Sequence, residues 1–169
     1  MLSKRRHRRA AFTLIETLLA VTITAVLLTA VAIAFNASVI SYNTNEDIFK
    51  AVNNARQAAS RITTQLRSAT AVDANAPSNE CTMEIATGED ITYRYDSTDG
   101  TLYLVTNDDG TDDDYVLCEN VANAVFTKNT FVNDEGLIAV KSVQLTMTVN
   151  SGGVQQKVAA AAVVRRNLD

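Results

Sequence analysis

The first 72 residues combine an apolar run with an amphipathic one, and no strong helix breaker separates them. Residues 10–35 read AAFTLIETLLAVTITAVLLTAVAIAF, and about 20 apolar residues are enough for a helix to cross a bilayer. From residue 48 onward the apolar positions recur every four and three residues, which is typical of a helix with one buried face. These positions are Ile48, Val52, Ala55, Ala59, Ile62, Leu66 and Ala69. We therefore predict one long helix that begins near Phe12 and continues to about Val72.

The rest of the chain alternates apolar and polar residues with a period of two, which is typical of half-buried strands. All six glycines follow Pro77, the only proline, so the turn residues are confined to this part. The turns Ser97–Gly100 and Asn150–Gly153 each separate two alternating runs and predict β-hairpins. The predicted strands lie at residues 81–86, 91–95, 101–105, 115–118, 143–149 and 154–164.

These patterns together predict an α+β fold. A long N-terminal helix, first transmembrane and then amphipathic, packs on a small antiparallel β-sheet, because this arrangement buries both apolar faces. We place the transmembrane part of the helix at residues 12–35, its amphipathic part at 36–76 and the sheet domain at 77–169.

The charges are unevenly distributed along the chain. Residues 1–11 contain five of the fifteen Lys and Arg residues and no acid, whereas the remainder has ten basic residues against nineteen acidic ones. A basic flank before an apolar span stays in the cytoplasm, so we expect a single-pass protein whose C-terminal domain is periplasmic or otherwise extracytoplasmic. The acidic remainder argues against direct nucleic-acid binding, which requires Lys and Arg to neutralise phosphates.

Glu16 is the only charged residue between Arg9 and Glu46. A charged side chain at the centre of a bilayer costs about 2.5–3.5 kcal/mol on insertion scales, so an acid in such a segment points to a function. The motif around it, RAAFTLIE at residues 9–16, resembles the leader junction of type IV pilins and pseudopilins, with Ala11 where that family usually has glycine.

The resemblance implies that residues 1–11 are a basic leader peptide. The prepilin peptidase would cleave between Ala11 and Phe12 at the cytoplasmic membrane face and then methylate the new amino group of Phe12. It also implies that Glu16 acts in assembly, because the family carboxylate at this position meets the terminal amine of a neighbouring subunit. Low local dielectric strengthens such a pair.

The second half of the chain resembles a subgroup of this family. The segments YRYDSTDGTLYL, VLCENVANAVFTKN and IAVKSVQLTMTV are similar to J-type minor pseudopilins of type II secretion and to W-type minor pilins. The resemblance implies a pilin-like structural subunit of a type II secretion pseudopilus or a type IV pilus, inserted in the inner membrane. Its partners would be the prepilin peptidase, other pilins or pseudopilins, the inner-membrane assembly platform and the lipid bilayer.

Two other interpretations of the N-terminus stay open. An uncleaved helix would anchor a periplasmic binding or sensor domain by a single membrane pass. A Sec signal peptide cut after Ala32-Ile33-Ala34 would instead release a secreted protein that begins near Phe35.

Cys81 and Cys118 are the only cysteines, and both fall in the exported part. In an oxidising compartment they are a candidate disulfide, which would contribute about 3–4 kcal/mol in the chain-entropy model. The alternative is two separate buried thiols that behave as small apolar side chains.

The acidic run from Asn107 to Asp114 is the one candidate metal site. Asp108, Asp109, Asp112 and Asp114 offer carboxylate oxygens around Gly110, as calcium prefers, although the EF-hand spacing is absent. The alternative is a solvated acidic loop between strands. We expect no other cofactor and no enzymatic activity, because the only histidine, His7, lies in the leader and no nucleophile–histidine pair is left.

Overall fold

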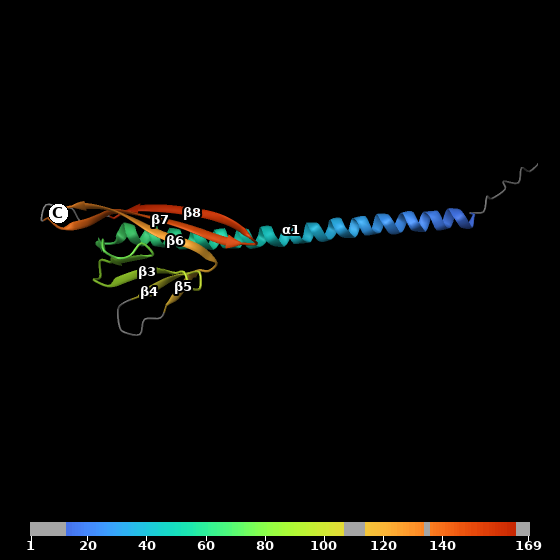
Figure 1. Cartoon of the computed structure of the whole chain (residues 1–169). Helices are drawn as coiled ribbons and strands as arrows, with labels where there is room; N and C mark the ends of the chain where they lie inside the picture. The colour runs from blue at the N-terminus through green and yellow to red at the C-terminus, as the bar shows by residue number, and fades with distance from the viewer. Residues whose placement is uncertain (1–12, 107–113, 134–135, 165–169) are drawn as a thin grey trace, which may run out of the picture. The chain divides into compact units, whose positions relative to one another are not determined.

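The computed structural model describes residues 13–106, 114–133 and 136–164. It divides into two compact units, Met1–Asn43 and Thr44–Asp169. Within the described residues the elements are, in chain order, α1 (Leu14–Ser68), β1 (Ala71–Val72), β2 (Glu80–Glu84), β3 (Asp90–Asp96), β4 (Thr101–Thr106), β5 (Tyr115–Cys118), β6 (Val121–Val132), β7 (Ile138–Ser151) and β8 (Val154–Val163) (Figure 1). The α+β class predicted from the sequence is confirmed.

The helix α1 confirms the predicted long helix, but it ends earlier than the sequence indicated. Its buried side chains in the second unit follow the predicted stripe and include Ala55, Ile62 and Leu66. The helix stops at Ser68, and residues 71–72 pair with β2 instead. The amide and the hydroxyl of Thr70 both donate to the Glu84 carbonyl oxygen. Pairing with a neighbouring strand therefore ends the helix, and no local breaker is needed.

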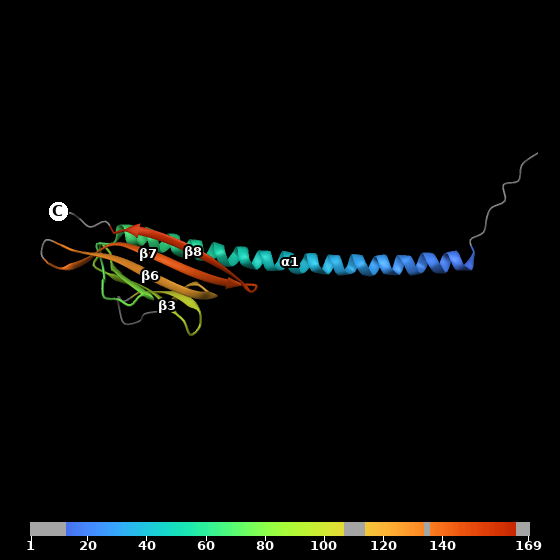
Figure 2. The same ribbon diagram turned by 45° about the horizontal axis from the view of Figure 1, so that its top comes forward.

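The strands form two antiparallel sheets, whereas the sequence predicted one. The first sheet has five short strands in the order β1-β2-β3-β4-β5, and the second has three longer strands in the order β6-β7-β8. Figure 2 shows that β6, β7 and β8 run beside the second half of α1. The single-sheet prediction was wrong because alternation of apolar and polar residues identifies a strand but does not indicate which other strand it pairs with.

Both predicted hairpins are confirmed. Residues 97–100 connect β3 to β4, with Asp96 paired to Thr101. The second turn consists of Gly152 and Gly153, which connect β7 to β8 and have φ values of 58° and 77°. Two successive residues with positive φ match the twist of the flanking strands, and glycine adopts this conformation without a Cβ clash.

Besides the short β1, the strand β6 is the element that the sequence analysis missed. It shifts register against β7 between Val121 and Asn123 and again between Asn129 and Thr130. Because of the first irregularity, the buried side chains of Val121, Ala124 and Phe126 are spaced by three and then two residues. A bulge of this kind interrupts the period of two by which a strand is recognised.

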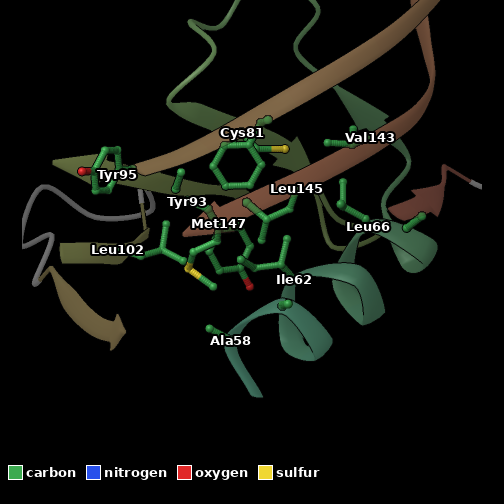
Figure 3. Close-up of a cluster of buried hydrophobic side chains, with 14 of the residues drawn as sticks. Ala58, Ile62, Leu66, Cys81, Tyr93, Tyr95, Leu102, Val143, Leu145 and Met147 are labelled. Carbon is green, nitrogen blue, oxygen red and sulfur yellow. The ribbon is translucent and has the colours of Figure 1, made fainter. Parts of the chain in front are cut away.

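A single core fills the second unit. Ile62 and Leu66 of α1 lie toward Leu145 and Met147 of β7 and toward Tyr93 of the first sheet (Figure 3). The Tyr93 hydroxyl donates to the Gln65 amide oxygen, so this large buried ring keeps a partner for its polar atom. The core therefore joins the helix to strands of both sheets.

Candidate processing and assembly segment

Glu16 and Thr13 close the first turn of α1 with a reciprocal set of hydrogen bonds. The Thr13 amide and hydroxyl donate to Oε2 of Glu16 at 2.9 Å and 3.0 Å. In return the Glu16 amide donates to Oγ1 of Thr13 at 3.3 Å. This is a capping box, in which the N-cap side chain and the residue three positions later satisfy helix donors that have no partner within the helix. Glu16 therefore stabilises the first turn of α1, and it is also the only charged residue of the helix before Glu46.

Apart from Glu16, the apolar part of α1 exposes only hydrophobic side chains and hydroxyls that are bonded within the helix. Every residue from 14 to 35 is exposed. The hydroxyls of Thr17, Thr22, Thr24 and Thr29 each donate to a carbonyl three or four residues earlier. Polar groups in lipid need partners within the protein, and these hydroxyls have them. α1 is also the one described helix that is long and apolar enough to cross a membrane.

The comparisons with known proteins single out this segment. A family model described as the prokaryotic N-terminal methylation motif matches residues 6–32, which include the capping box and most of the apolar run. Residues 6–32 therefore carry the methylation motif that prepilin-type proteins have at their N-terminus. Searches of curated proteins and of solved structures found no match. The methylation motif implies processing by the prepilin peptidase and assembly with other pilins.

The predicted processing residues, Ala11 and Phe12, lie outside the described residues. Cleavage between them therefore stays a prediction. Glu16, the predicted assembly residue, is described, and its carboxylate is bound by Thr13 of the same chain. The sequence analysis missed the role of Thr13, although the signal was present: threonine followed three residues later by glutamate is typical of a helix start.

The two cysteines correct one sequence prediction. Both are buried free thiols, Cys81 on β2 and Cys118 on β5. Two strands, β3 and β4, separate them in the first sheet. Neighbouring strands are about 4.8 Å apart, so three steps place the cysteines about 14 Å apart. A disulfide needs Cα atoms within about 7 Å of each other. The candidate disulfide was therefore wrong, and the alternative of two separate buried thiols describes the structure.

Burial should also make these thiols unreactive. It raises the pKa of Cys81 and of Cys118 to about 11 each, whereas an exposed thiol ionises near pH 8.5. Since the thiolate is the nucleophile, we expect maleimide to label neither cysteine at pH 7.5 in the folded protein and both in denaturant, as measured by intact mass. The same labelling without any reductant is the control. If the denatured chain took up two maleimide labels only after treatment with a reductant, the two cysteines would not be free thiols.

The pKa shifts also predict how stability depends on alkaline pH. The unfolded thiols lose their protons above about pH 8.5, while the folded thiols keep theirs to about pH 11. The folded state then binds more protons, so the free energy of unfolding falls as pH rises through this window.

The predicted calcium loop is largely outside the described residues. Asp108, Asp109 and Asp112 belong to the undescribed segment 107–113. Asp114 is described, and its Oδ2 lies 2.6 Å from Nη2 of Arg94, with both side chains partly exposed. Among the described residues no group of three or more His, Cys, Asp or Glu side chains is arranged to hold a metal ion. Calcium binding stays a prediction, which a comparison of melting curves in calcium and in chelator would test.

Proposed function

We propose that this protein is a minor pilin-like assembly subunit of a type II secretion pseudopilus or a type IV pilus. In this proposal it enters the inner membrane through residues 12–35 with its C-terminal domain outside the cytoplasm. The prepilin peptidase then removes residues 1–11 and methylates Phe12. The processed subunit joins other pilins at the inner-membrane assembly platform and polymerises through α1, without contacting nucleic acid.

The methylation motif at residues 6–32 is the observation that carries this proposal. Two features of the same segment support it. Residues 14–35 expose only side chains that are apolar or hydrogen-bonded within the helix. A helix that moves from lipid into a bundle of similar helices needs such a surface. Glu16 adds one acid to this surface, and an acid there is tolerated when a cation neutralises it. A terminal amine at Phe12, released by cleavage, would be such a cation.

The uncleaved membrane anchor is the second candidate function. It rests on the same apolar span, which by length and composition alone is sufficient for anchoring. In that case the C-terminal domain would act as a binding or sensor domain and Glu16 would serve only as a helix cap. The two functions differ in the N-terminus of the mature chain.

The mass of the N-terminal peptide from native membranes tests the proposal. We expect a mature chain that begins at Phe12 and carries one extra methyl group, because the peptidase both cleaves and methylates. An inactivated prepilin peptidase is the matched control and should leave the chain beginning at Met1. If the wild-type chain also begins at Met1, the protein is an anchored domain; a start near Phe35 would make it a secreted protein.

A further inference from the structure

The second unit contains a groove that lies outside the apolar segment, residues 12–35, through which we propose that the protein enters the membrane. It has a volume of about 480 Å³ and lies between the first turns of α1 in this unit and the strand β5. Asp47 and Asn54 line the helix side, and Val116 and Glu119 line the strand side. At its end lie Asn120, between β5 and β6, and Asn150, near the end of β7. The Asn150 amide donates to the Asn120 carbonyl oxygen at 2.8 Å, which joins the end of β7 to the turn after β5.

The strand side of the groove is the border of the first sheet. Within the described residues, β5 is the last strand and pairs with β4 alone (Figure 1). Tyr115 and Val116 on this strand are 55% and 53% exposed. A border strand offers unpaired main-chain N–H and C=O groups, and proteins usually cover such a border or place lysines on it. β5 has no lysine, so no positive charge on this strand repels another extended chain.

The opposite wall and the ends of the groove supply the other groups that a peptide needs. Side-chain amides such as those of Asn54, Asn120 and Asn150 both donate and accept hydrogen bonds, as peptide groups require. Asp47 and Glu119 contribute two carboxylates. Lys50 also lines the groove, but its Nζ lies 2.7 Å from Oε1 of Glu46. The groove is therefore acidic on balance and favours a partner with basic side chains.

We propose that this groove binds an extended, basic polypeptide segment of another protein, which adds as a strand to the border of β5. Main-chain hydrogen bonds would supply affinity, and Asp47 and Glu119 would select Lys or Arg at alternate positions of the bound segment. The long border strand β8 provides an internal comparison. It carries Lys157, and the cavity beside its end is lined by Arg67, so the same basic segment is disfavoured there.

Peptide binding to the full chain in lipid nanodiscs tests this proposal. The probe is a capped nine-residue peptide in which Thr, Val and two Lys alternate, and its partner has Glu in place of both Lys. We expect the Lys peptide to bind and the Glu peptide to bind about tenfold more weakly, because of electrostatic complementarity. The double variant Asp47→Asn, Glu119→Gln should weaken the Lys peptide by about fivefold, as two partly exposed charge pairs allow. Glu84→Gln, at an exposed acid on β2, is the matched control and should change nothing.

Amide hydrogen exchange in the same samples separates strand addition from adsorption of a cation. The bound Lys peptide should slow exchange at Tyr115–Cys118 and leave the amides of β8 unchanged. The proposal is overturned by protection at β8 in place of β5, by equal binding of the two peptides, or by no binding at about 1 mM Lys peptide. None of these outcomes depends on the N-terminus of the chain, so they leave the proposed pilin-like function unaffected.

Discussion

Glu16→Ala should leave the protein in the inner membrane but exclude it from the assembled filament. The substitution removes the one acid of the apolar segment, and a neighbouring terminal amine would then lie unpaired in a low dielectric. Truncating one partner of a buried charge pair costs about 2–5 kcal/mol. The incorporated fraction should therefore fall by more than about tenfold, since each 1.4 kcal/mol corresponds to about one decade. Immunoblots of sheared filaments and of membranes measure the two pools.

The capping box makes a second variant decisive. Glu16→Gln keeps an oxygen that can accept from the Thr13 amide and hydroxyl, but it removes the charge. If Glu16 acts as a charge partner, Gln should fail as Ala does. Normal incorporation of Gln together with failure of Ala would instead show that Glu16 acts through the helix start. Glu46→Ala, at an exposed acid of the same helix that pairs with Lys50, is the control and should assemble normally.

Ile62→Ala should destabilise the C-terminal unit more than any surface substitution on α1. Ile62 is 0% exposed and lies among Leu145, Met147 and Tyr93 (Figure 3). Truncating a buried isoleucine to alanine costs about 2–5 kcal/mol, because both burial and packing contacts are lost. For a unit of this size we expect Tm to fall by roughly 10–20 °C. The near-UV circular dichroism of the tyrosines in the full chain follows this transition.

Phe49→Ala is the matched control for this prediction. Phe49 belongs to the same helix and the same unit, but its side chain is 70% exposed. Surface substitutions of this kind usually change stability by no more than about 0.5 kcal/mol. Equal losses for Ile62→Ala and Phe49→Ala would contradict the assignment of the buried face.

Much of the fold can be predicted from local patterns in the sequence. The stripe that includes Ala55, Ile62 and Leu66 predicts the buried face of α1, because helical periodicity directly reports which side chains face the core. The pair Gly152–Gly153 likewise predicts the closing hairpin, since two positive φ values are needed there. Neither pattern depends on a distant segment, and both predictions are confirmed.

Other features depend on partners that are remote in sequence. The end of α1 at Ser68 follows from the pairing of Ala71–Val72 with β2. The irregular strand β6 is stabilised by eleven paired positions with β7, although its own alternation is broken. The separation of Cys81 from Cys118 depends on the strand order in the first sheet. That order cannot be deduced from the number of residues between the two cysteines.

The sequence by itself determined the N-terminal segment of this protein. The basic flank at residues 4–9, the acid at Glu16 and the apolar run are chemical properties of consecutive residues, and they can be recognised without knowledge of the fold. The tertiary structure alone decided that the strands form two sheets, that the cysteines stay apart, and that an acidic groove borders β5. The physical reason is that strand order, register and burial arise from contacts between residues far apart in the chain, and each is selected by the total packing of the core.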